Sequence, residues 1–103
     1  MGASAAMTYL QGGKKEQIDL AILNMVGTLA GLICDGAKGG CSFKLVTAVN
    51  EAYTQSLLAL DGTSIALHDG IVGSNSDETI DNLGKLSQKG MEQVDKFLVD
   101  IML

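Results

Sequence analysis

The chain has 103 residues, and seven lysines, no arginine and twelve carboxylates give it a net charge of −5. This length fits one domain. The acidic balance argues against a partner such as DNA or RNA, because a protein that binds a phosphate backbone needs a basic face. With 47% hydrophobic and 18% charged residues, the chain is too apolar to be intrinsically disordered. Thirteen glycines, no proline and only two tyrosines and two phenylalanines indicate helices whose backbones approach closely.

The N-terminal residues lack the basic segment and the long apolar stretch of a signal peptide. Residues 20–33 form the longest apolar stretch, but Asn24, Gly27, Thr28 and Gly31 interrupt it, and it is shorter than the roughly twenty residues that span a bilayer. Two cysteines do not make a disulfide framework. We therefore expect a soluble cytoplasmic protein with reduced thiols and no membrane partner.

Residues 3–10 are predicted to be the end of a helix, and Gly12-Gly13 breaks it. Domains usually begin in polar, frayed sequence, so this apolar start predicts a portion of a larger protein. From Lys15 onward, apolar residues recur at steps of three and four, which predicts one stripe along a helix. The stripe contains Ile18, Ala21, Ile22, Met25, Val26, Leu29, Leu32 and Ile33.

Residues 34–40 contain three glycines and are predicted to form a loop. A second helical pattern then runs through Val46, Val49, Tyr53, Leu57 and Leu60. Asp61-Gly62 is a typical C-terminal stop for it. Residues 63–72 are compatible with either a short helix or an extended connection.

The last helical pattern begins after Ser74-Asn75-Ser76, which offers an N-cap followed by two carboxylates where the helix dipole favours them. Its apolar positions are Ile80, Leu83, Leu86, Met91, Val94, Leu98 and Ile101. Gly84 and Gly90 interrupt it and predict a kink, a break into two helices or a close backbone contact. The expected fold is all-α, with residues 1–103 forming one helical domain. We expect a bundle of about four helices with a glycine-rich cysteine loop.

The loop from Cys34 to Cys41 carries the residues best suited to chemistry. Its glycines allow backbone N–H groups to converge on an anion, and Lys38 and Asp35 add a cation and a carboxylate. The spacing alone leaves three alternatives open: free, partly buried structural cysteines, a redox disulfide, or a metal or cluster site. His68 stands beside Asp69 and is either half of a catalytic pair or a histidine with a local hydrogen bond in a loop.

Specific residues in and around this loop resemble the C-terminal part of the L-serine dehydratase α-chain-like family, and most closely its iron–sulfur L-cysteine desulfidase branch. The most specific piece is the run from Gly31 to Lys38, together with Cys41 and Lys44. Further matching pieces follow in the same order along nearly the whole chain: Gly12-Gly13, Gln17-Ile18, Asn24-Met25, 69–72, 78–80, 82–84, Gly90-Met91 and 100–102.

The resemblance implies an enzyme that removes water or hydrogen sulfide from a small β-substituted amino acid, L-serine or L-cysteine, with release of pyruvate and ammonia. In that family three cysteines hold a [4Fe–4S] cluster, and its open iron acts as a Lewis acid. Carried onto this sequence, the resemblance implies that Cys34 and Cys41 bind the cluster. It also makes Asp35, Lys38 and Lys44 candidates for catalysis or substrate binding.

The chain departs from the family pattern in two respects. Family members are several times longer, and this chain corresponds to their C-terminal end. No third cysteine is present, so the cluster is expected to be incomplete or absent here and the chain inactive alone. The expected partners are the remainder of the parent protein or further copies of the chain. A rival interpretation is a non-catalytic helical module that self-associates through Gly/Ala-rich faces.

Overall fold

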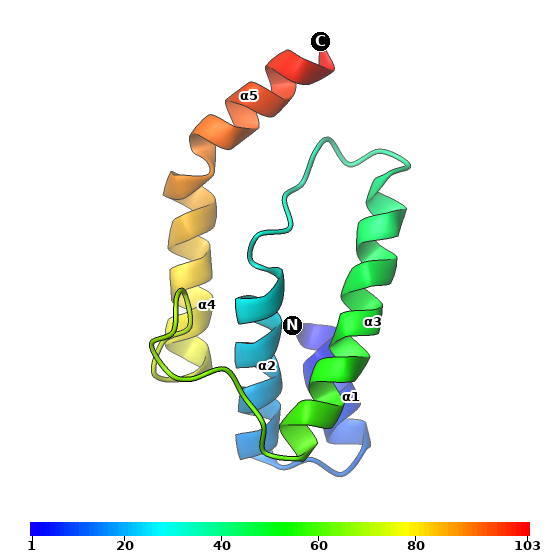
Figure 1. Ribbon diagram of the computed structural model, residues 1–103, viewed down its shortest axis with the longest axis vertical. Helices are drawn as coiled ribbons and strands as arrows, with labels where there is room; N and C mark the ends of the chain where they lie inside the picture. Colours follow the sequence, from blue (N-terminus) through cyan, green and yellow to red (C-terminus); the bar gives the residue numbers. More distant parts are fainter.

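The computed structural model covers residues 1–103 and contains five α-helices, one π-helical turn and no strand (Figure 1). The elements are α1 (Gly2–Leu10), α2 (Lys15–Leu29), α3 (Cys41–Leu60), α4 (Ser76–Lys85), η1 (Leu86–Gly90) and α5 (Glu92–Met102). The predicted all-α fold is confirmed. It has one helix more than the four expected, because the last helical pattern divides at η1. None of the helices is both long enough and apolar enough to cross a membrane.

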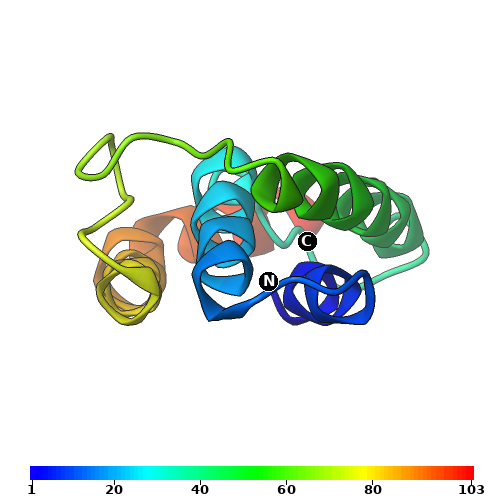
Figure 2. The ribbon, with the colours of Figure 1, turned by 90° about the horizontal axis from the view of Figure 1, so that it is seen from below.

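The first three helices pack against one another, and α4 lies on the other side of α2 (Figure 2). Among the helical elements, α5 packs only against η1, and it extends away from the other helices in Figure 1. The molecule measures 47 × 28 × 15 Å. Since one helix with its side chains is about 10 Å in diameter, the chain forms a thin slab with little interior.

Small side chains form the contact between α1 and α3. Ser4, Thr8, Ala52, Ser56 and Ala59 are all buried there. The Ser4 hydroxyl donates to the carbonyl oxygen of Ala52 at 2.8 Å, so the side chain of one helix reaches the backbone of the other. Serine, threonine and alanine therefore make this close contact, and glycine takes no part in it.

The large apolar side chains of α3 lie mostly outside this contact. Val46, Val49, Tyr53 and Leu57, which we call the α3 outer face, are 59%, 43%, 54% and 44% exposed. Apolar periodicity alone would have placed this stripe against the core. The residues that do face α1 and α2 are small or polar, because only they allow the close approach seen at Ala52.

The predicted breaks at Gly12-Gly13 and Asp61-Gly62 are confirmed. Gly12 and Gly62 have φ angles of +88° and +77°, the left-handed conformation that glycine adopts most readily. The next residue in each case donates its N–H back to the helix, Gly13 to Thr8 at 2.9 Å and Thr63 to Leu58 at 2.9 Å. Both helices therefore end in the same hydrogen-bonded cap.

The expected extent of the second helix was wrong at its C-terminal end. α2 stops at Leu29, whereas the apolar stripe continued to Leu32 and Ile33. A turn closed by the N–H of Leu32 and the carbonyl of Leu29, at 3.0 Å, follows the helix. Leu32 and Ile33 instead line a pocket at the end of α2.

Residues 61–75 connect α3 to α4 without a helix, so the extended alternative for residues 63–72 is the closer one. The side-chain amide of Asn24, a buried residue of α2, makes two hydrogen bonds to the backbone of this connection. Its Nδ2 donates to the carbonyl of Thr63 at 3.0 Å, and its Oδ1 accepts from the N–H of Ile65 at 2.9 Å. Asn75 then caps α4, as predicted, by accepting from the N–H of Glu78 at 2.8 Å.

The predicted interruption near Gly90 is a break between helices. Residues 86–90 form the π-helical turn η1, and α5 leaves it in a new direction (Figure 1). A Cβ atom on Gly90 would lie 2.9 Å from Cδ1 of Leu86, so a larger residue would crowd this turn. Gly84, by contrast, lies within α4 with open space around it.

Candidate functional site

The cysteine loop joins the end of α2 to the start of α3. Cys34 is exposed within the loop, and Cys41 is the first residue of α3 and half-buried. Both cysteines are free thiols. The two thiols do not form a disulfide here, and the partial burial of Cys41 remains compatible with a structural role as well as with binding.

Backbone amides make the surroundings of Cys34 favourable for an anion. The N–H groups of Gly36 and, next, Ala37 lower the pKa of the Cys34 thiol. These two residues have φ angles of +118° and +51°, and such a left-handed turn directs consecutive N–H groups to one side. The glycine-containing turn therefore favours negative charge at the sulfur of Cys34.

Lys44 connects the loop to α3 through an ion pair with Asp35. The pair raises the pKa of Lys44 and lowers the pKa of Asp35, chiefly through their mutual hydrogen bond. Cys41 and Cys34 also contribute to the raised pKa of Lys44, so the ammonium lies within electrostatic reach of both thiols. An ion pair and these electrostatic effects therefore link four of the five predicted site residues, although Cys34, Asp35 and Cys41 do not converge as a group that could hold a metal ion. The fifth, Lys38, is exposed and makes no ion pair or side-chain hydrogen bond.

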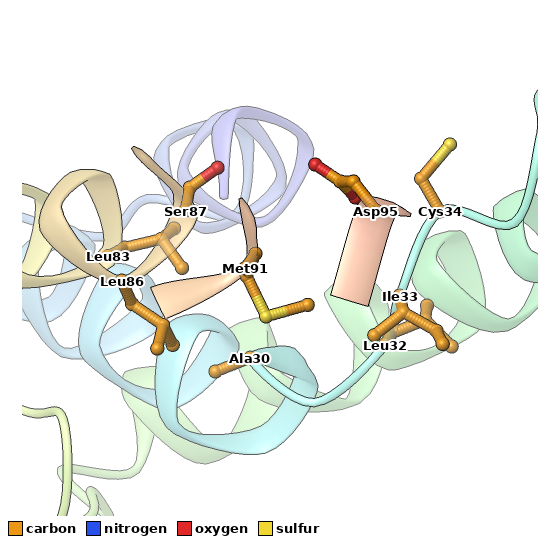
Figure 3. Close-up of a pocket in the computed structure, with 9 residues that line it drawn as sticks. All are labelled: Ala30, Leu32, Ile33, Cys34, Leu83, Leu86, Ser87, Met91 and Asp95. Atoms are coloured by element: carbon orange, nitrogen blue, oxygen red, sulfur yellow. The ribbon is translucent and has the colours of Figure 1, made fainter. Parts of the chain in front are cut away.

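A pocket of ≈ 320 Å³ lies beside Cys34, between the end of α2, α4, η1 and the start of α5. Figure 3 shows its apolar floor and, above it, the hydroxyl of Ser87, the carboxylate of Asp95 and the sulfur of Cys34 pointing to the same side. The lining consists of Ala30, Leu32, Ile33, Cys34, Leu83, Leu86, Ser87, Met91 and Asp95. Its volume falls in the range of small-molecule sites.

Ser87 and Asp95 had not been identified from the sequence. They belong to the last helical pattern, more than fifty residues beyond Cys34, and no motif marks them. They reach the cysteine loop because η1 turns α5 toward it. Met102, near the end of α5, also contacts the loop, since a Cβ on Gly36 would lie 2.6 Å from its sulfur.

The other single-residue candidate, His68, lies far along the chain in the connection between α3 and α4. Its side chain makes no hydrogen bond to Asp69, and its backbone N–H donates to the carbonyl of Gly73 at 3.4 Å. It has a φ angle of +63°, so it forms part of a tight turn. The structure therefore shows neither a His68–Asp69 hydrogen bond nor a local hydrogen bond of the His68 side chain.

The anion-stabilising loop predicts a measurable reactivity for Cys34. In a Cys41→Ser background, alkylation of Cys34 by iodoacetamide should show a lower pH midpoint in the folded chain than in urea. The thiolate is the nucleophile, and the amides of Gly36 and Ala37 that lower its pKa converge only when the loop is folded. An equal or higher midpoint in the folded chain would show that these amides do not stabilise the thiolate.

Comparison with known proteins places this loop in a family context. The family model described as serine dehydratase alpha chain matches residues 1–100. A UPF0597 protein from Desulfatibacillum aliphaticivorans is 48% identical over 102 residues, which are 99% of this chain and 23% of the relative. UPF0597 proteins from Caldanaerobacter subterraneus (45% over 103 residues, 100% of this chain and 24% of the relative) and Parabacteroides distasonis (43% over 101 residues, 98% and 24%) are similar. The chain spans about a quarter of the length of these relatives. No solved structure matches it.

Proposed function

Because the chain belongs to the serine dehydratase alpha chain family, we propose that it forms part of an iron–sulfur-dependent lyase acting on L-serine or L-cysteine. The reaction is a deaminating elimination that removes water or hydrogen sulfide and yields pyruvate and ammonia. The observation that carries the proposal is the electrostatic linkage of Cys34, Asp35, Cys41 and Lys44 beside a small pocket. Since the chain spans about a quarter of its relatives, the complete activity belongs to a larger assembly.

The residues of this chain alone do not fit a complete [4Fe–4S] cluster. Such clusters are held mainly by cysteine thiolates, and only Cys34 and Cys41 are present. No group of three or more His, Cys, Asp or Glu side chains converges anywhere in the structure. We therefore assign two ligands to this chain and the remaining ones to protein outside residues 1–103.

We propose that the residues of the loop stabilise negative charge on a cysteine that binds the iron–sulfur cluster. The amides of Gly36 and Ala37 favour the thiolate of Cys34, the form that binds a metal. The ammonium of Lys44 adds positive charge near both thiols, and its ion pair with Asp35 ties the loop to α3. These contacts favour the anionic form of Cys34 and fasten the loop to α3, the helix that begins at Cys41.

The neighbouring pocket suits a small amino acid. Its volume of ≈ 320 Å³ leaves room for serine or cysteine. The carboxylate of Asp95 supplies a counter-charge for a substrate ammonium group, and the hydroxyl of Ser87 supplies a hydrogen-bonding partner. Asp95 and Ser87 are thus proposed to orient the substrate beside Cys34.

The proposal is tested in a chimera in which this chain replaces the matching segment of the Desulfatibacillum relative. After anaerobic reconstitution with iron and sulfide, we expect broad visible charge-transfer absorption, and pyruvate release from L-serine or L-cysteine. Cys34→Ser and Cys41→Ser should each abolish the absorption, because each removes a ligand. Ser42→Ala, a neighbouring change that removes no thiol, should preserve it.

The absorption and the activity answer different questions in this experiment. Absorption that survives both Cys→Ser substitutions would contradict the assignment of these ligands. Absorption without pyruvate from either amino acid would contradict the proposed substrates. A reconstituted chimera without any charge-transfer absorption would contradict the proposed iron–sulfur cluster.

The rival function, self-association through Gly/Ala-rich faces, receives less support from the structure. The small residues of those faces, such as Ala21, Ala52 and Ala59, are buried inside the chain. They contribute to packing between its own helices and offer no free surface. The surfaces open to a partner carry large apolar side chains instead.

A further inference from the structure

We propose that the α3 outer face docks on the part of a serine dehydratase alpha chain that lies outside the quarter represented by this chain. Its four residues, Val46, Val49, Tyr53 and Leu57, follow one another at steps of three and four residues and so line one side of α3. The proposal concerns a protein surface and rests on family membership, independently of the proposed reaction.

The α3 outer face has the composition of an interface. Its side chains are between 43% and 59% exposed, although all four are apolar or aromatic. Between Leu45 and Leu60 the only charged residue is Glu51, which lies on another side of the helix and hydrogen-bonds Gln55. A solvent-facing helix normally carries charged residues on its outer side, and depletion of charge is typical of buried interface cores.

The total surface area of the chain points in the same direction. A compact monomer of 10.7 kDa is expected to expose about 5,500 Å². The chain exposes 6630 Å², an excess of about 1,100 Å² over that expectation. A stable interface covers about 800 Å² on each partner, so the excess is large enough for one extensive docking surface.

The length of the relatives indicates which polypeptide covers the α3 outer face. In the Desulfatibacillum and Caldanaerobacter proteins, a segment similar to this whole chain occupies only 23% and 24% of the polypeptide. The matching segment is there accompanied by about three times as much additional chain, which can cover the outer side of a thin slab. A second copy is a poorer occupant, because each copy carries a net charge of −5 and like charges oppose association.

The test compares two cysteine variants with nearly equal exposure. Tyr53→Cys places a thiol on the α3 outer face, where the native side chain is 54% exposed, and Leu67→Cys places one in the α3–α4 connection, where it is 53% exposed. Both are made with Cys34→Ser and Cys41→Ser, so maleimide labelling followed by mass spectrometry reports a single thiol. Without these two cysteines, the result does not depend on a cluster.

We expect both thiols to react at similar rates in the isolated chain. In the chimera with the Desulfatibacillum relative, labelling of Tyr53→Cys should slow at least tenfold relative to Leu67→Cys. Equal slowing of both thiols, or none, would overturn the proposal. An isolated chain that is dimeric by light scattering and becomes monomeric with Tyr53→Lys would also overturn it, since a second copy would then be the occupant.

A second measurement decides the case in which the chimera fails to fold. The tagged chain is co-expressed with the Desulfatibacillum relative lacking the matching segment, and an equimolar complex is expected to co-purify. Tyr53→Lys should abolish this complex, and the matched Leu67→Lys should retain it. No complex in this experiment, together with an unfolded chimera, would reject the docking surface.

Discussion

Asn24→Ala is expected to lower the free energy of unfolding by about 2 kcal/mol, because a hydrogen-bonded group in the interior is lost and its partners are left unpaired. Asn24 is only 2% exposed, and its amide both donates to the carbonyl of Thr63 and accepts from the N–H of Ile65. These two bonds fasten the α3–α4 connection to α2. Urea unfolding followed by circular dichroism measures the change.

A matched substitution separates this clamp from general effects of losing an asparagine. Asn50 is exposed on α3 and its side chain makes no hydrogen bond, so Asn50→Ala should change stability by less than about 0.5 kcal/mol. Hydrogen exchange supplies a local measurement, because the N–H of Ile65 should lose protection in Asn24→Ala alone. Equal unfolding midpoints for the two variants would contradict the importance of the clamp.

Gly13→Ala is expected to destabilise the chain by about 2–3 kcal/mol, the cost typical of overpacking. The new Cβ would lie 2.7 Å from the backbone oxygen of Thr8 and 2.6 Å from its Cγ2. Neither atom can easily move, since Thr8 is fully buried and its hydroxyl donates to the carbonyl of Ser4 at 2.8 Å. The variant should therefore melt at a clearly lower temperature.

Gly84→Ala is the matched control and should change stability in the opposite direction. Gly84 lies within α4, and nothing would touch its Cβ within 4 Å. Alanine in a helix is more stable than glycine by about 0.5–1 kcal/mol, so the melting temperature should rise. An unchanged or higher melting temperature for Gly13→Ala would show that the contact with Thr8 does not crowd the new methyl group.

Local signals in the sequence predicted much of the fold. Gly12-Gly13, Asp61-Gly62 and the cap at Asn75 act through the backbone of a few neighbouring residues, so their effects can be inferred without the rest of the structure. The interruption near Gly90 was likewise visible, although its π-helical form was not. The all-α class followed from the periodicity of the apolar residues.

The packing of α3 could not be predicted in the same way. Periodicity indicates that Val46, Val49, Tyr53 and Leu57 share one side of a helix, but it does not say what covers that side. The contact inside this chain instead uses residues such as Ala52 and Ser56, whose small size permits the close approach to α1. The shortage of charged residues between Leu45 and Leu60 agrees with a covered face, but it does not identify what covers it.

The candidate site was predicted in part for a similar reason. Cys34, Asp35, Cys41 and Lys44 lie within eleven residues, so a loop and one helical turn suffice to bring them together. Ser87 and Asp95 join the pocket through the direction of α5, which depends on η1. Lys38 lies in the same loop but makes no ion pair or side-chain hydrogen bond. The spacing of the residues alone could not distinguish it from Lys44.

The small-residue contact between α1 and α3 also restricts how this part of the sequence can change during evolution. These buried side chains, Ser4, Thr8, Ala52, Ser56 and Ala59, have little volume to lose by truncation. A larger side chain would instead push apart helices that approach closely enough for the Ser4 hydroxyl to donate to the carbonyl of Ala52. Accepted substitutions there should be exchanges among glycine, alanine, serine and threonine. In this thin protein, selection should therefore act more strongly against gains in side-chain volume at this contact than against losses.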